Sequence, residues 1–142
     1  MEMLSIYHDL ILEHARNTKN SGRIENPDLQ AKVFNPLCGD ELELTISLNG
    51  STIDDCKTLV RGCSICHASA SMMIEIILKK TLNEVEGICV MFFESLQKEN
   101  GEVSITIDSL RPLVALKNHR SRVKCMKLAW EALEDCTNNS QY

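Results

Sequence analysis

The sequence has no run of apolar residues close to the ~18 to 20 that a membrane-spanning helix needs, which excludes a transmembrane segment. It also lacks an excess of positive charge: 15 Lys and Arg stand against 20 Asp and Glu, a formal net charge of −5. Neither nucleic acid nor an anionic membrane is therefore expected as a partner. There are no internal repeats and no low-complexity segment. A chain of 142 residues with these properties predicts one domain over 1–142.

The N-terminal stretch lacks the basic region that opens a secretory signal peptide, and it carries Glu2 and Asp9 instead. We therefore expect a cytoplasmic protein. The seven cysteines are an odd number, and without an export signal they argue against a disulfide framework. Metal binding or thiol chemistry is the better interpretation. Some of the thiols are then expected to pack as small hydrophobic side chains, as we predict for Cys56, Cys89 and Cys136.

Periodic spacing of apolar residues predicts helices separated by polar segments. A loop is expected over 17–30, which is rich in Asn, Ser, Gly and Asp, and the state of 98–108 stays open. The predicted helices cover residues 3–16, 67–80, 83–97, 110–116 and 121–136.

A β-hairpin is predicted in the first half of the chain. Residues 42–48 alternate apolar and polar side chains, as a half-buried strand does, and Asn49-Gly50 favours a tight type I′ turn before a return strand over 51–61. A two-residue turn pairs Leu48 with Ser51 and, continued, sets Cys38 opposite Arg61. Cys38, Asp40 and Cys63 are therefore expected to meet at the open end of the hairpin, give or take a bulge of one residue.

The last predicted helix has one continuous apolar stripe, and Cys125 is its N-terminal member. The thiol of Cys125 is thus expected to point inward near the end of the core. Arg122 lies one turn away on the same face, where its guanidinium could hold a thiolate, a persulfide or a carboxylate. The stripe comprises Cys125, Leu128, Ala129, Ala132, Leu133 and Cys136.

Cys38, Asp40, Cys63 and Cys125 together offer three thiols and a carboxylate. Such a set can close a tetrahedral zinc site or hold an iron–sulfur cluster. Gly39 would let the backbone approach closely between the first two ligands. A metal or sulfur-handling protein is therefore the first hypothesis from the residues themselves.

The run from Cys63 to His67 also matches other patterns. It has the C-x-x-C-H form of covalent haem attachment, but that chemistry requires export. Its C-x-x-C pair would suit a dithiol oxidoreductase, although the preceding hairpin is not the βαβ unit that usually accompanies that motif. A zinc finger would show a second close ligand pair. Whether Cys66 or His67 adds a ligand to the site stays open.

These residues resemble the IscU/NifU N-terminal-like family of iron–sulfur cluster assembly proteins, and within it the SufU branch. The resemblance covers nearly the whole chain. Where IscU-type scaffolds carry a His before the last cysteine, this chain has Lys124, which favours the SufU branch. The matching segments are Asn35–Asp40, Gly62–Ile65, Ala68–Met73, Arg122–Cys125 and Leu128–Leu133.

The resemblance implies an α+β fold of the SufE/NifU-like kind: a small antiparallel β-sheet with helices packed on one side and a metal site at one exposed end. It implies zinc held by Cys38, Asp40, Cys63 and Cys125, and a pyridoxal-phosphate cysteine desulfurase as partner. Cys38, on a loop, is expected to move at least cost and is our candidate sulfur acceptor, with Arg122 as a second candidate catalytic residue.

Two functions follow from the resemblance. In the first, the protein is a zinc-dependent sulfurtransferase that relays persulfide sulfur. In the second, it is a scaffold on which a transient [2Fe–2S] cluster is assembled and passed to apo iron–sulfur proteins or a downstream scaffold. Lys124 in place of His favours the first, and the sequence leaves open whether the chain is an enzyme.

Overall fold

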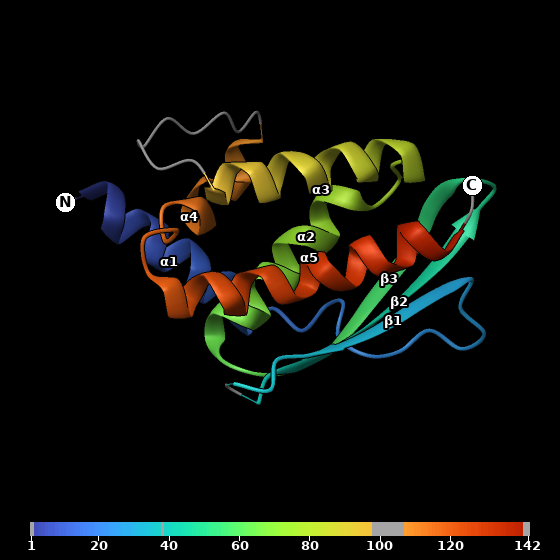
Figure 1. Cartoon of the computed structure of the whole chain (residues 1–142), viewed down its shortest axis with the longest axis horizontal. Helices are drawn as coiled ribbons and strands as arrows, with labels where there is room; N and C mark the ends of the chain where they lie inside the picture. The colour runs from blue at the N-terminus through green and yellow to red at the C-terminus, as the bar shows by residue number, and fades with distance from the viewer. Residues whose placement is uncertain (1, 38, 98–106, 141–142) are drawn as a thin grey trace.

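A three-stranded sheet and a layer of helices on one of its faces make up the fold (Figure 1). The computed structural model describes residues 2–37, 39–97 and 107–140. In chain order the elements are α1 (Glu2–Arg16), β1 (Leu29–Phe34), β2 (Glu41–Asn49), β3 (Thr52–Arg61), α2 (Ser64–Ile77), α3 (Leu82–Gln97), the 3₁₀ turn η1 (Asp108–Leu110), α4 (Arg111–Val114) and α5 (Arg120–Ser140).

The sheet has the order β1-β2-β3, and both strand pairs are antiparallel. Alternate side chains of the central strand β2 are buried beneath the helices: Leu42, Leu44 and Ile46 are fully buried. Because successive side chains of a strand point to opposite faces, the remaining side chains of β2 lie on the opposite face of the sheet, and these are polar: Glu41, Glu43, Thr45 and Ser47. The predicted α+β fold with helices on one side of a small antiparallel sheet is confirmed.

A hydrogen-bonded aromatic cluster joins α2, α3 and α5 inside the helical layer. Trp130 of α5 stacks on Phe92 of α3 with the ring centroids 4.5 Å apart. Its indole N–H donates to the Ser69 hydroxyl of α2 at 3.1 Å, and that hydroxyl donates to the Met126 carbonyl at 2.7 Å. The Trp130 N–H and the Ser69 hydroxyl thus both have partners, so these hydrogen bonds compensate the burial of the indole N–H.

The hairpin forms where we predicted it, but its register is different. Asn49 pairs with Thr52 instead of lying in the turn, and Gly50 alone of the two turn residues has a positive φ, +66°. This suits a type II′ turn, which needs glycine at the first central position, and not the predicted type I′. A bulge after Ser47 adds one more residue of shift, so Glu41, and not Cys38, lies opposite Arg61.

A third strand was missed. The predicted loop holds through residue 28 but is wrong for its last two residues, because β1 begins at Leu29. Its side chains alternate between half-buried and exposed, and it pairs with β2 over its whole length. The loop that precedes it runs beside β3, where the Gly22 N–H donates to the Thr58 carbonyl at 2.9 Å.

Most helices agree with the predictions at 3–16, 83–97 and 121–136. The predicted helix 67–80 in fact spans 64–77. The backbone leaves the helical conformation at Leu78, whose ψ is 133°, and Lys79 follows with a left-handed φ of +69°. The segment 110–116 forms η1 and the short α4, with Pro112 in the first turn where its missing N–H costs nothing. The open question over 98–108 falls mostly on 98–106, outside the described residues. In the part of the chain that the structure describes, no helix has the length and apolarity to cross a membrane.

Candidate metal centre

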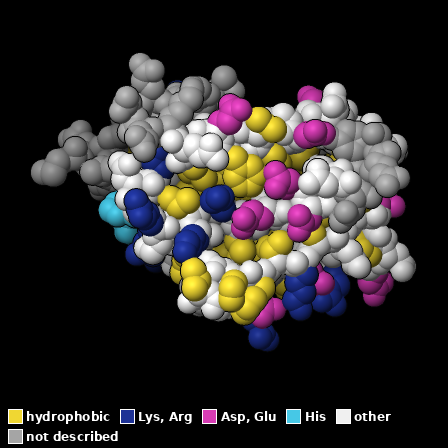
Figure 2. All heavy atoms as spheres, in the orientation of Figure 1, with side chains coloured by type: hydrophobic (Ala, Val, Ile, Leu, Met, Phe, Trp, Pro, Cys, Tyr) yellow, Lys and Arg dark blue, Asp and Glu magenta, His cyan; other side chains and the backbone are white. Residues whose placement is uncertain are grey.

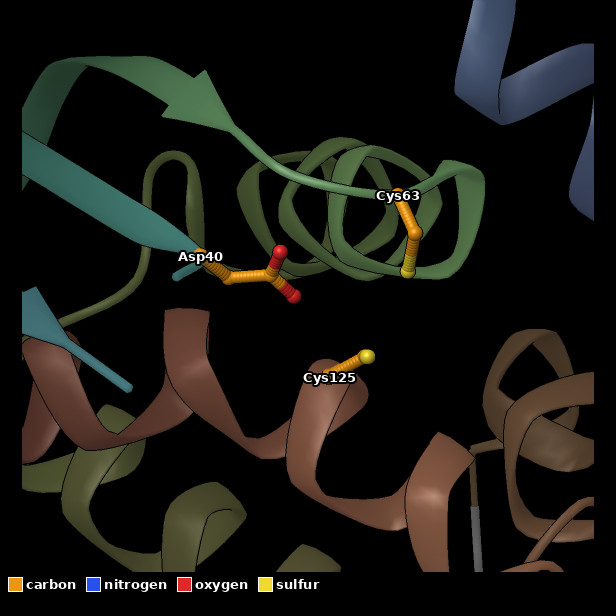
Figure 3. Close-up of side chains that lie close together, drawn as sticks. All are labelled: Asp40, Cys63 and Cys125. Carbon is orange, nitrogen blue, oxygen red and sulfur yellow. The ribbon is translucent and has the colours of Figure 1, made fainter. Parts of the chain in front are cut away.

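Three of the four predicted ligands converge at one end of the sheet (Figure 3). Asp40 precedes β2, Cys63 is the N-cap residue of α2, and Cys125 lies in the second turn of α5. One carboxylate oxygen and the two sulfur atoms lie within 4.8 Å of one another. The fourth predicted ligand, Cys38, lies outside the described residues.

The turn between β1 and β2 fixes Asp40 through its backbone. The Asn35 N–H donates to the Asp40 carbonyl and the Gly39 N–H donates to the Asn35 carbonyl, both at 2.8 Å. Gly39 has a φ of +78°, a conformation that glycine adopts without steric cost. Asp40 is thereby held at the end of the β1–β2 ladder with its side chain directed at the two thiols.

The Asp40 carboxylate is buried yet incompletely paired. The residue is 7% exposed, and its Oδ2 atom makes no hydrogen bond. A buried carboxylate oxygen without a partner costs free energy, which a bound cation would recover. Two sulfurs within 4.8 Å of that carboxylate supply the donor types that zinc prefers. The residues present therefore fit a zinc ion.

The electrostatics of the cluster disfavour its fully ionised form. Burial, followed by the neighbouring Cys63 thiol and Asp40 carboxylate, raises the pKa of the Cys125 thiol well above its usual range. The thiol donates to the Ser121 carbonyl at 3.4 Å. A cysteine binds a metal as the thiolate. A cation at this position would therefore lower the thiol pKa, and its binding would release protons.

Gly62 has a role that sequence reasoning missed. A Cβ atom added there would lie 3.0 Å from Cγ of Asp40 and 3.2 Å from Cβ of Cys66. Only glycine leaves room for the carboxylate between β3 and α2. The one signal in the sequence is the position of this glycine directly before Cys63.

Neither Cys66 nor His67 joins the three-residue group among the described residues. Cys66 is fully buried within the first turn of α2. His67 instead lines a small polar pocket on another side of α2, together with Asn17 and Ser71.

The remaining described cysteines pack in the core, as predicted. Cys56, Cys89 and Cys136 are buried, at most 3% exposed. Burial raises the pKa of the Cys89 thiol to about 12 and that of the Cys136 thiol to about 12, and it raises the pKa of Cys56 as well. Protonated thiols of this kind are inert.

Arg122 and Lys124 flank Cys125, and both are exposed. Arg122 lines a groove of about 390 Å³ between α1 and the start of α2, which it shares with Tyr7 and Ser64. Lys124 lines separate hollows on the β1 side. The two cations therefore lie on either side of the centre.

Comparison with known proteins defines the class. Residues 6–139 match the model of the NifU-like N terminal domain, and the chain belongs to this family. It is 33% identical over 130 residues to the zinc-dependent sulfurtransferase SufU of Bacillus subtilis, covering 92% of this chain and 88% of that protein. It is 26% identical over 135 residues to the iron–sulfur cluster assembly scaffold protein IscU of Streptococcus pyogenes, covering 95% and 84%.

Solved structures agree. A Fervidobacterium islandicum protein assigned to the SUF system as an iron–sulfur cluster assembly scaffold superposes with a TM-score of 0.84 at 30% identity, covering 94% of this chain and 97% of that one. The N-terminal NifU-like protein of Brucella abortus superposes with a TM-score of 0.86 at 23% identity, covering 99% and 98%, and shares the fold.

Proposed function

We propose that this protein works in iron–sulfur cluster assembly as a zinc-binding acceptor of persulfide sulfur from a pyridoxal-phosphate cysteine desulfurase. The observation that carries the proposal is the unpartnered, buried Asp40 oxygen beside the thiols of Cys63 and Cys125. Family membership and the 33% identity to a zinc-dependent sulfurtransferase support it.

Cys38, Asp40, Cys63 and Cys125 would hold the metal. Cys38 comes from the same β1–β2 connection as Asp40, two positions earlier, so it completes a set of four from three parts of the fold. When bound, zinc would supply the positive charge that keeps these thiols deprotonated and reduced.

The sulfur-accepting role is assigned to Cys38. Its thiolate would attack the outer sulfur of the donor's persulfide, form a new S–S bond and displace the donor's thiolate. Cys63 precedes helix α2 and Cys125 belongs to helix α5, whereas Cys38 falls in the connection between β1 and β2, so we expect it to move at least cost. Arg122, exposed at the groove beside Ser64, would orient an anionic sulfur species on its way to the centre.

A cluster scaffold is the second candidate, favoured by the IscU relatives and by a donor set that also suits a [2Fe–2S] cluster. In that case the cluster would be passed to apo iron–sulfur proteins or a downstream scaffold. Lys124 weighs against it, because a protonated ammonium has no lone pair and the exposed side chain lines a different hollow.

The direct test is metal content and sulfur transfer together. We expect one zinc per chain in the purified protein, and loss of that zinc with lower thermal stability in Cys63→Ser and Cys125→Ser. Cys89→Ala, which alters a buried thiol of α3, is the matched control and should keep its zinc. After incubation with a desulfurase and cysteine, the Cys38 peptide should gain about 32 Da as a persulfide.

Two results would contradict the proposal. Full zinc in both serine variants would mean that the ligands are assigned wrongly. Sulfur found on Cys66 alone would make the C-x-x-C pair the working centre in place of Cys38.

A further inference from the structure

The two edges of the sheet differ in whether their outward backbone groups have hydrogen-bond partners. The outer edge of β3 is covered at both ends: the Thr58 N–H donates to the Asn20 carbonyl at 3.0 Å, and the Ile53 N–H donates to the Lys80 carbonyl at 2.8 Å. Within the described ranges, no such backbone partner lies along the outer edge of β1. An edge strand with unpaired backbone groups is a template for another strand.

The register shows which groups face that open edge. The Asn35 N–H bonds to the Asp40 carbonyl, and β1 pairs with β2 without a register shift. Hydrogen-bonded pairs alternate along an antiparallel ladder, so every second residue back from Asn35 bonds to β2. The backbone groups directed outward then belong to Gln30, Lys32 and Phe34.

A hollow surface continues from the end of this edge. Two adjoining depressions of about 280 and 350 Å³ surround the exposed Leu37, and they share Asn35 and Lys124. Leu128 of α5 lies in the lining of the first. Phe34 and Leu37 are 58% and 78% exposed, which is unusual for large apolar side chains so close together.

The charge around this hollow is positive although the chain as a whole is acidic. Between residues 109 and 130 there is no Asp or Glu, whereas the basic residues there are Arg111, Lys117, Arg120, Arg122, Lys124 and Lys127. Figure 2 shows hydrophobic side chains gathered beside Lys and Arg at the lower left, where Figure 1 places the loop after β1 and the start of α5.

One acidic side chain lies at the far end of the hollow. Glu131 lines the first depression, where burial raises the pKa of its carboxyl while nearby Lys127 opposes that shift. Arg120 and Lys124 line the second depression, with no acidic residue in that lining. Arg120 and Lys124 are therefore the cations available to pair with a carboxylate of a ligand.

We propose that the β1 edge and the adjoining hollow dock an extended, acidic segment of a partner protein. The segment adds a fourth strand by pairing with Gln30, Lys32 and Phe34. It places an apolar side chain against Leu37 and Leu128, and its carboxylates lie near Arg120 and Lys124. This is β-augmentation, in which the backbone gives affinity and side-chain pockets give specificity. The inference does not depend on which metal the centre holds.

The probe is a short fluorescent peptide of alternating Glu and Val with a central Phe, titrated against the full zinc-loaded chain. We expect saturable binding and slowed hydrogen exchange of the Gln30, Lys32 and Phe34 amides. A peptide of the same composition with its acidic and apolar residues in two blocks should bind more weakly, because it cannot place alternate side chains on the two faces of a strand.

Two pairs of variants separate backbone pairing from charge. Lys32→Pro removes an outward N–H without touching the β1–β2 ladder and should weaken binding about tenfold. Lys32→Ala removes the same side chain and its ion pair with Glu41 but keeps the outward N–H, so binding should stay within about twofold. Lys124→Glu should weaken binding about fivefold, whereas Lys19→Glu, an equally exposed reversal in the loop after α1, should leave it unchanged.

Several outcomes would overturn the proposal. These are no binding at about 1 mM peptide, binding without protection of the three amides, or equal losses in Lys124→Glu and Lys19→Glu. Pairing of β1 with a second copy, seen as a dimer by sedimentation that Lys32→Pro abolishes, would replace the partner segment by this chain itself. If Lys32→Pro fails to fold, Lys124→Glu and the exchange pattern still decide.

Discussion

Asp40 is the residue on which the two candidate functions diverge. In the proposed zinc relay Asp40 would be one of four ligands, so its removal would weaken the site. Its Oδ2 atom is buried and has no hydrogen-bond partner, which a bound cation would supply. In a cluster scaffold, by contrast, a carboxylate ligand favours release, so its loss should trap the cluster.

We predict that Asp40→Ala lowers zinc affinity and the stimulation of desulfurase turnover. Anaerobic reconstitution of this variant with iron and sulfide should give no stable coloured species. Zinc competition with a chromophoric chelator and visible absorption spectra measure the two effects. Asp9→Ala, an exposed carboxylate on α1, is the control. A persistently brown Asp40→Ala protein would make the scaffold the primary function.

At the scale of single residues, the sequence predicted the members of the candidate centre better than the residues around them. Asp40, Cys63 and Cys125 meet as expected because they sit at ends of elements whose positions the apolar periodicity indicates. The role of Gly62 was missed because it is steric and depends on where β3 and α2 pass each other. Arg122 lies on the outer rim of a groove, which helical periodicity alone could not determine.

At the scale of elements, the junction between β3 and α2 sets the shape of the centre. We predict that Gly62→Ala weakens zinc binding, because its methyl group would meet the Asp40 carboxylate and Cys66 at 3.0 to 3.2 Å. The backbone of Gly62 does not have a left-handed φ, so the effect is steric and not a conformational strain.

The matched control is Gly87→Ala in α3, where an added Cβ meets nothing within 4 Å. That change should raise the free energy of unfolding by about 0.5–1 kcal/mol, since alanine suits a helix interior better than glycine. Calorimetric zinc titration and chemical unfolding of both variants check the pair. Unchanged zinc affinity in Gly62→Ala would show that the carboxylate can move aside freely.

The elements themselves were predicted with uneven success. Long amphipathic helices such as α5 follow from their apolar stripe, because burial of one face dominates their stability. The register of the hairpin did not follow, since Gly50 takes the first turn position and a bulge after Ser47 shifts the rest. Strand β1 was missed because its short alternating pattern follows directly on a polar loop.

At the scale of the whole molecule, the buried thiols link stability to alkaline pH. The pKa values of Cys89 and Cys136 are raised to about 12 in the folded protein, above those of the unfolded chain. Below the ordinary thiol pKa both states hold the proton. Above it the unfolded chain loses protons that the folded chain keeps, so the free energy of unfolding should fall by about 1.4 kcal/mol per pH unit for each thiol.

Guanidinium unfolding of the zinc-free protein between about pH 8 and pH 10 measures this slope. Cys89→Ala should have a shallower decline than the wild type, because one linked proton is gone. Val90→Ala, an exposed neighbour on the same helix, should keep the wild-type slope. Equal slopes in all three proteins would mean that the Cys89 thiol ionises freely in the folded state.

The stacked Trp130 gives the molecule a built-in optical reporter. It is the only tryptophan in the chain, so excitation at the long-wavelength edge of protein absorption selects a single side chain in the interior. That point lies little more than one helical turn beyond Cys125 and touches both α2 and α3. Its fluorescence emission can therefore report in real time, without any label, whether binding or loss of a metal at the centre changes the surroundings of Trp130 in the core.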